Sequence, residues 1–287
     1  MLKKNRKTEP SMRNGLLLAA LIGVMVVSTA RADSAAPLAS HRAGYEISLG
    51  TANSDRSMSA DAPIAAAGLI AYEFRGSTCE GYASNFRQLT ELQRSEGGAV
   101  ASDINAVSFE DGEAKSLHFE ISTQTAGAAQ PPISGSAARE DNGSIDVDLV
   151  KPGKEKVDIG RDILFPTQHV ERIISTAKQG GRVLEARVFD GSDTGKKVYS
   201  TLTIIGPQHK GESLDSAVSP KLAEVPRWPV TISYFNEVNK DSAPDYTMSF
   251  DLYENGVSGS LKLDYGAFAL TAKLKKLEFL PDSNCGK

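Results

Sequence analysis

The feature that most constrains the fold of this chain is an alternation of apolar and polar residues that recurs between residues 45 and 279. A period of two places successive side chains on opposite faces of a β-strand, and the β-branched and aromatic residues that favour strands are enriched in these runs. The runs cover residues 45–49, 68–74, 82–92, 104–109, 117–121, 145–149, 183–189, 198–205, 230–235, 246–253, 257–265 and 268–279. The sequence therefore predicts a mainly β protein.

Residue pairs that close tight turns separate several of these runs. They are Asp111-Gly112, Asn142-Gly143, Asp190-Gly191 and Asn255-Gly256, which readily adopt a positive φ. Short turns join antiparallel neighbours, because parallel neighbours need long crossovers. About a dozen strands exceed what one flat sheet usually carries, so a barrel, a sandwich and a coiled sheet all remain open. Longer loops are expected at residues 51–62, 125–132 and 208–226, and the last is a candidate hinge.

Residues 166–180 interrupt the two-residue period. One face of a helix would carry the apolar residues Val170, Ile173, Ile174 and Ala177. Thr167 is the expected N-cap, and Gly180 is the expected stop at the C-terminal end. We expect one helix of about three turns that packs on the sheet as a lid or plug.

The first 32 residues have the pattern of a cleavable signal peptide. A basic region precedes an apolar run at residues 16–27, and Ala30 and Ala32 form the small-residue pattern of a cleavage site. A helix of that run would span about 18 Å, against about 30 Å of hydrocarbon, so a membrane anchor is the less favoured alternative. We expect cleavage near Ala32 and a soluble periplasmic product that comprises residues 33–287.

The charge of the chain argues against a nucleic-acid partner. The net charge is -4 at pH 7, and removal of the basic leader would make the remainder more acidic. Proteins that bind nucleic acid usually present a basic face. The chain also contains no phosphate-binding glycine motif, so no nucleotide cofactor is expected.

The chain contains two cysteines, Cys79 and Cys285. In an oxidising compartment an isolated pair is most simply a disulfide. Such a bridge would close a loop of about 200 residues and stabilise the fold by at most about 5 kcal/mol. Two unrelated thiols are the alternative, and a metal site is disfavoured because ligand-pair spacing is missing.

No catalytic or metal signature is evident. The histidines, none spaced as a metal-ligand pair, are His41, His118, His169 and His209. His169, at the start of the predicted helix, is the best candidate for a functional role. The segment GSTCEG at residues 76–81 lacks the G-x-S-x-G pattern of a hydrolase nucleophile. We therefore predict no catalytic residue, no metal and no cofactor.

Aromatic residues are spread over the predicted strands. A coiled sheet of this size can enclose an apolar groove that aromatic side chains line. The candidates are Tyr72, Phe74, Tyr82, Phe86, Trp228, Tyr234, Phe235, Tyr246, Phe250, Tyr253, Tyr265 and Phe268. Filling of the core is the simpler interpretation for any one of them, and no ligand-binding residue is assigned.

Several stretches, in order along nearly the whole chain after the leader, carry a family resemblance. They are YEFRGSTCEGY (72–82), FPTQH (165–169), VFDGSDTGKKVY (188–199), WPV (228–230) with Tyr234-Phe235, LYENGV (252–257), LDYGAF (263–268) and Cys285. With these stretches the chain resembles the EipB family of periplasmic cell-envelope integrity proteins.

The resemblance implies a specific fold. About fourteen antiparallel strands would form an open, twisted barrel, called a β-spiral, with one α-helix packed on it, as a single domain over residues 33–287. It also implies a disulfide between the positions of Cys79 and Cys285.

The resemblance further implies a non-enzymatic factor that supports cell-envelope integrity and is linked to a periplasmic tetratricopeptide-repeat protein. The similarity of the family fold to lipoprotein carriers suggests a lipid or lipopeptide ligand, by analogy of fold. Two alternatives stay open. One is an envelope hydrolase of glycan or peptide, with two carboxylates across a cleft or His169 beside an acidic partner. The other is a structural protein whose sheet edge docks a partner.

Overall fold

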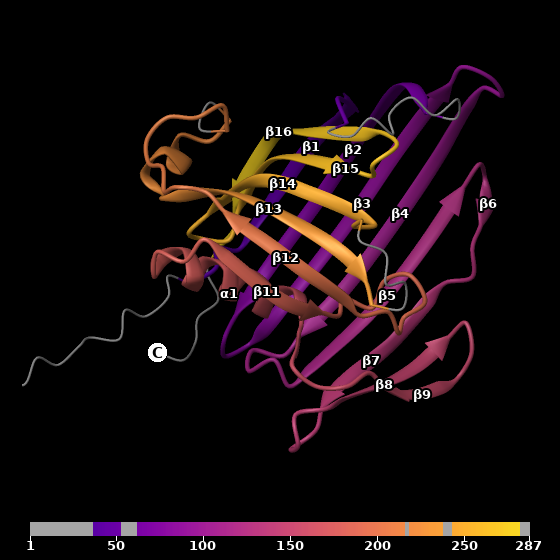
Figure 1. Ribbon diagram of the computed structural model, residues 1–287, viewed down its shortest axis with the longest axis vertical. Coiled ribbons are helices and arrows are strands. Elements are labelled where there is room, and N and C mark those ends of the chain that lie inside the picture. Colours follow the sequence, from indigo (N-terminus) through magenta and orange to yellow (C-terminus); the bar gives the residue numbers. More distant parts are fainter. Residues whose placement is uncertain (1–36, 53–61, 216–217, 238–242, 282–287) are drawn as a thin grey trace, which may run out of the picture. The chain divides into compact units, whose positions relative to one another are not determined.

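The computed structural model describes residues 37–52, 62–215, 218–237 and 243–281 (Figure 1). All of these belong to one compact unit, Ala35–Lys287. The predicted signal peptide, most of the predicted loop 51–62, and Cys285 lie outside the described residues. Within the described ranges, no helix is long and apolar enough to span a membrane.

The strands form one sheet. Their bounds are β1 (His41–Gly50), β2 (Pro63–Ser77), β3 (Gly81–Arg94), β4 (Ala99–Glu110), β5 (Ser116–Thr125), β6 (Ala128–Ala129), β7 (Ile133–Arg139), β8 (Ile145–Lys151), β9 (Glu155–Asp158), β10 (Ile163–Leu164), β11 (Val183–Val188), β12 (Tyr199–Ile205), β13 (Arg227–Asn236), β14 (Tyr246–Tyr253), β15 (Ser258–Asp264) and β16 (Ala269–Phe279). Neighbours pair antiparallel, except that β10 runs parallel to β11. The predicted mainly β fold is confirmed.

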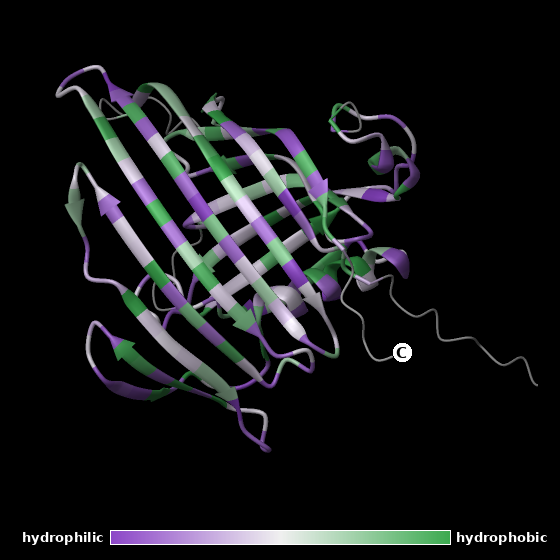
Figure 2. Ribbon diagram, turned by 180° about the vertical axis from the view of Figure 1, so that it is seen from behind, coloured by the Kyte–Doolittle hydropathy of each residue, from purple (hydrophilic) through white to green (hydrophobic). Residues whose placement is uncertain are grey.

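The order of the strands shows how the sheet closes on itself. It runs β10-β11-β12-β13-β14-β15-β16-β1-β2-β3-β4-β5-β7-β8-β9, so that the first strand lies between β2 and the last strand. The long strands β2–β5 form one layer, and β11–β16 cross it as the other (Figures 1 and 2). The result is an open, twisted barrel. The 16-stranded sheet exceeds the expected fourteen strands by the two-residue strands β6 and β10.

Strand register decides which face each side chain takes. On the outer face of β3 and β4, Arg87 pairs with Asp103 at 2.8 Å, and hydrophilic and hydrophobic residues alternate along the strands (Figure 2). The inner face of the same strands carries Tyr82, Phe86 and Ile104. This alternation is the two-residue period of the sequence, which places successive side chains on opposite faces of the sheet.

The helix α1 (Pro166–Lys178) lies where the sequence predicts it, and Gly180 ends it with a φ of 80°. The prediction that Thr167 is the N-cap is wrong: Phe165 occupies that position and makes no side-chain capping bond. The reason is tertiary. The carboxylate of Glu110, at the end of β4, accepts the backbone N–H groups of Thr167 and Gln168 and so replaces a local cap.

Two of the predicted tight turns differ from expectation. In the turn after β4, the residue with a positive φ is Ala114, at 54°, and not Gly112. Position 112 nevertheless requires glycine, because a Cβ there would overlap the backbone of Thr78.

Asp190 and Gly191 do not close a tight hairpin. They begin a longer connection between β11 and β12 that packs on the ring of Phe119 in β5.

The predicted loop 208–226 contains the short 3-10 helix η2 (Pro220–Glu224). Leu222 is fully buried, and the carboxylate of Asp215 accepts the backbone N–H and the hydroxyl of Ser260 in β15. Arg227 donates to Asp251 at 3.0 Å and to the carbonyl of Gly211 at 3.0 Å. The described residues of this candidate hinge are therefore packed on β14 and β15.

Candidate functional site

Helix α1 closes one end of the coiled sheet. Its apolar face packs on strands β12–β14, in a cluster that contains Ile173, Ile174, Ala177, Ile205, Trp228, Val230, Ile232, Phe250 and Leu252. Its other side faces β3 and β4, where the hydroxyl of Tyr82 donates to Glu171 at 3.1 Å. The apolar stripe predicted from the sequence is confirmed, and the helix joins the two layers of the sheet.

Glu110 is the main polar contact between this helix and the sheet. It is 3% exposed, and its carboxylate accepts the backbone N–H of Thr167 at 2.7 Å and that of Gln168 at 3.1 Å. Burial raises the pKa of Glu110, against the smaller opposing effect of these hydrogen bonds. Sequence reasoning missed this contact, because it placed the N-cap at Thr167, whose own side chain could have capped the helix.

A small, partly open cavity lies between the first turn of the helix and the inner face of β1–β4. Its volume is about 90 Å³, and its lining includes His41, Tyr72, Phe74, Tyr82, Ser84 and Ser108. The rings of Phe74 and Tyr82 stack with centroids 5.5 Å apart. The hydroxyls of Ser84 and Ser108 are hydrogen bonded to each other at 2.8 Å. We refer to this cavity as the α1 pocket.

His41 lines the α1 pocket, and both of its ring nitrogens are withdrawn from solvent. The ring is 2% exposed, and its Nδ1 lies 2.7 Å from the carbonyl oxygen of Ala39. Because a carbonyl only accepts, Nδ1 carries the proton. Burial lowers the pKa of His41, so the ring is neutral at pH 7 and Nε2 is an acceptor. Nε2 has no hydrogen-bond partner among the described residues.

Beyond the α1 pocket, the inner face of the sheet is only partly covered. Glu110, Leu117 and Phe119 are buried at the closed end, whereas inner-facing residues further along the same strands are half-buried. The half-buried residues include Phe86, Gln88, Ile104, Ala106 and Ile121. A mostly apolar surface therefore continues from the pocket along β3–β5.

The aromatic residues proposed from the sequence as groove-lining candidates divide among the core, the inner face and the outer face of the sheet. Tyr234 and Tyr246 stack on the inner side with centroids 4.4 Å apart, and Tyr199 contacts both edge-on. Phe235 lines a depression on the other face of β13. Tyr253 is fully buried beneath the segment 208–226, and its hydroxyl lies 3.0 Å from that of Ser213. Tyr253 is thus a core residue.

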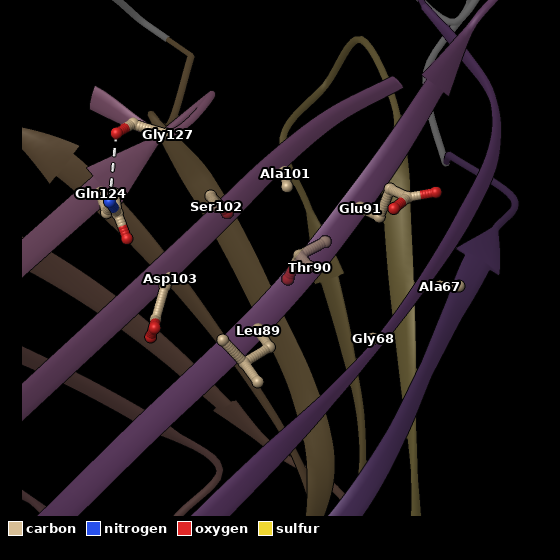
Figure 3. Close-up of a pocket in the computed structure, with 10 residues that line it drawn as sticks. All are labelled: Ala67, Gly68, Leu89, Thr90, Glu91, Ala101, Ser102, Asp103, Gln124 and Gly127. Atoms are coloured by element: carbon tan, nitrogen blue, oxygen red, sulfur yellow. Dashed lines mark hydrogen bonds between the residues drawn. The ribbon is translucent and has the colours of Figure 1, made fainter. Parts of the chain in front are cut away.

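The outer face of β2–β5 carries a wider but shallower depression of about 500 Å³ (Figure 3). Small residues form its floor, among them Ala67, Gly68 and Ala101. The polar side chains at its margin do not converge: Gln124 donates to the carbonyl of Gly127, and Asp103 pairs with Arg87. It lacks the convergent polar groups of a specific site.

One form of the hydrolase alternative, His169 beside an acidic partner, is not formed among the described residues. His169 is buried, burial lowers its pKa to about 4, and its Nε2 has no hydrogen-bond partner in the described part of the chain. The nearby carboxylates of Glu110 and Glu171 are engaged by the helix N-terminus and by Tyr82. The described residues also contain no group of three or more side chains placed to hold a metal ion.

The structure does not test the predicted disulfide. Cys79 lies in the turn between β2 and β3. Its expected partner, Cys285, lies outside the described residues, so the bridge stays a prediction.

A single sheet that coils into an open barrel, closed at one end by a helix, places the protein among the β-barrel-like proteins. The model of the EipB-like family matches residues 32–281, and the chain belongs to this family.

Two similar proteins come from Brucella abortus. The cell envelope integrity protein EipB of strain 2308 is 34% identical over 250 residues, which are 87% of each chain. A crystal structure titled as a beta-barrel-like protein of a domain of unknown function has a TM-score of 0.77 and 33% identity. It covers 85% of this chain and 99% of its own.

Proposed function

We propose that this protein supports cell-envelope integrity as a non-enzymatic periplasmic factor that binds the acyl chain of an envelope lipid or lipopeptide on the inner face of its sheet. Membership of the EipB-like family and the name of the Brucella abortus relative support the envelope role. The signal-peptide pattern of the first 32 residues supports the periplasmic location.

The observation that carries the binding proposal is the half-buried inner face of β3–β5. Ile104, Ala106 and Ile121 form an apolar surface inside the barrel that neither the helix nor the opposite layer fully covers. Burial of an acyl chain contributes about 0.8 kcal/mol for each methylene. About ten methylenes would therefore offset the several kcal/mol that association costs.

A protein partner, such as the tetratricopeptide-repeat protein that the resemblance implies, would more simply dock on a sheet edge. The edge strand β9 is short, and Glu155, Lys156 and Asp158 on it are exposed. Short, charged edges discourage pairing with another chain. This observation favours a ligand inside the barrel over a partner at that edge.

The test compares an inner-face variant with an outer-face variant of the same strand. Protein depleted of lipid is titrated with an envelope lipid extract while its melting temperature is followed, because a ligand that binds only the folded state raises it. We expect the rise for the wild type and for Val107→Asn, whose side chain is 44% exposed on the outside. We expect it to be lost in Ile104→Asn. No rise in the wild type, or equal effects of the two variants, would refute the proposal.

A further inference from the structure

The polar groups that line the α1 pocket are mostly engaged within the protein. The hydroxyls of Ser84 and Ser108 are hydrogen bonded to each other, and that of Tyr82 donates to Glu171. Nδ1 of His41 donates to a backbone carbonyl, and Nε2 of the same ring has less than 1 Å² of accessible surface. The pocket therefore presents mainly ring and aliphatic carbon to a ligand.

The charges around the pocket argue against an ionic group inside it. None of the described side chains that line it carries a charge at neutral pH, because burial keeps His41 neutral. Burial raises the pKa of Tyr72 and Glu110 raises it further, and Glu171 adds to burial in the same way at Tyr82. An anion would therefore meet negative charge and no cation. A cation would lose its hydration without a counter-ion in the lining.

The polarity of the inner face changes along β3–β5, away from the pocket. The row of facing residues next to the pocket is apolar and consists of Phe86, Ala106 and Ile121. The row four residues further along each strand carries hydroxyls and consists of Thr90, Ser102 and Thr125. Four residues of a strand span about 14 Å. A ligand with one apolar end and one polar end would therefore match this face in only one direction.

The size of the pocket limits what enters it. A volume of about 90 Å³ is near three times the space that one water molecule occupies in the liquid, about 30 Å³. About the last three carbons of an acyl chain fit this volume, and a phospholipid headgroup does not.

We propose that the α1 pocket receives the methyl end of an acyl chain, while the rest of the chain lies along β3–β5 with its polar head towards the hydroxyl row. The inference rests on the proposed function, because it gives the direction of the ligand that the inner face binds and makes the pocket the limit of its length. A methyl end needs neither a hydrogen bond nor a counter-ion, and its burial removes apolar surface from water.

The direction is tested with two acids of equal chain length. Lipid-depleted protein is titrated at pH 7.5, below the critical micelle concentrations, with palmitate and with hexadecanedioate, which carries a carboxylate at both ends. Calorimetry gives both Kd values. We expect the diacid to bind at least about 10-fold more weakly, because its second carboxylate would enter a pocket without a cation. If the head entered the pocket instead, the second carboxylate would lie beyond the hydroxyl row and the two acids would bind equally.

The role of the pocket as a length limit is tested with saturated fatty acids from octanoate to stearate. The Kd should fall about 4-fold for each carbon, the equivalent of about 0.8 kcal/mol, until the methyl end reaches the back of the pocket. Val170→Phe should shorten this limit by about two of the three carbons that the pocket holds, and Val170→Ala should lengthen it. Arg172→Ala, exposed on the same helix, is the matched control and should leave the limit unchanged.

A further variant distinguishes a methyl end from a polar one. Among the described residues that line the pocket, Tyr72 has the hydroxyl without a hydrogen-bond partner in the described part of the chain. Tyr72→Phe removes that hydroxyl and should change the Kd of palmitate by less than about 2-fold, because a methyl end makes no hydrogen bond. Val170→Ala keeps the length test valid if Val170→Phe does not fold.

Three results would overturn the inference: equal binding of the two acids, a length limit that is absent or that neither Val170 variant moves, and loss of palmitate binding in Tyr72→Phe. If the two acids bind equally and Ile104→Asn weakens both, the pocket assignment is wrong and the acyl-chain proposal stands. The same conclusion follows if neither acid binds while the envelope lipid extract still raises the melting temperature. If the extract fails as well, both proposals are wrong.

Discussion

The carboxylate of Glu110, at the end of β4, accepts a 2.7 Å hydrogen bond from the backbone N–H of Thr167, in the first turn of α1. A helix N-terminus carries unpaired N–H groups and a partial positive charge, and a carboxylate satisfies both. Because the cap comes from the sheet, the position of the helix depends on the register of β4. The same contact fixes the helix turn that forms one wall of the α1 pocket.

Removal of this carboxylate should loosen the closed end of the barrel. We expect Glu110→Ala to lower the free energy of unfolding by about 1–3 kcal/mol, because two buried N–H groups lose their acceptor. Urea denaturation measures the change. Glu113→Ala, in the exposed turn after β4, is the control and should change stability by less than about 0.5 kcal/mol. Equal effects of the two substitutions would contradict the capping role.

Buried His169 should make the fold sensitive to acid. Its pKa in the folded state is about 4, against an ordinary value of 6.5. Between these values the unfolded chain binds the proton first, so stability falls as the pH drops from about 6.5 to about 4. The loss attributable to this side chain is on the order of 3 kcal/mol. Urea unfolding at several pH values between 4 and 7 measures it.

The contribution of His169 is isolated by comparison with a variant. Burial shifts the pKa of His41 in the same direction, whereas the raised pKa values of Glu110 and Glu171 favour the folded state as the pH falls. We therefore expect His169→Gln to flatten the pH profile and the exposed-site control His209→Gln to leave it unchanged. A His169→Gln profile as steep as that of the wild type would show that the buried ring does not govern acid sensitivity.

Gly191 should tolerate no side chain. Its φ is 74°, and a Cβ would overlap the ring of Phe119. We expect Gly191→Ala to destabilise the fold by about 2–4 kcal/mol, from backbone strain and overpacking together. Gly143 has a similar φ of 85° but open space around it, so Gly143→Ala should cost only about 1 kcal/mol. Similar losses for both would mean that packing on Phe119 contributes nothing.

The predicted Cys79–Cys285 bridge is tested by reduction. Opening a loop of this length restores entropy to the unfolded chain. We expect dithiothreitol to lower the melting temperature of the wild type by several degrees and to have no effect on Cys79→Ser. If mass spectrometry finds two reduced thiols in protein purified from the periplasm, the bridge does not exist.

Most of the fold could be predicted from local patterns. Strands with large alternating side chains and the helix at residues 166–178 were all found, because their periods are set by residues close in sequence. Strand β7 was missed because its sequence, ISGSAAR, has few large apolar residues, and β9 was missed because it is short and mostly charged. These two strands form through pairing with their neighbours: β7 pairs with β5, and β9 pairs with β8.

The candidate site could not be predicted in the same way. His41, Tyr72, Ser84 and Ser108 come from four different strands, and only their register brings them to one cavity. The sequence made His169 the best candidate for a functional histidine. In the structure its ring is buried, and Nε2 has no hydrogen-bond partner among the described residues. No motif in the sequence around Glu110 or His41 indicates that either residue belongs to a site.

The pairing of β1 with β16 determines when the protein can finish folding. Ser48 and Thr271 are 223 positions apart in the chain, yet their hydroxyls lie 2.9 Å apart across this pair. Contacts between such distant residues form late, and until they form the edges of β1 and β15 are open to other chains. If a chain crosses a membrane with its N-terminus first, β1 emerges early. The edge of β1 that pairs with β16 then stays exposed until the rest of the chain has crossed. A chain exported in this way would therefore pass through an aggregation-prone interval whose length is set by the arrival of β16.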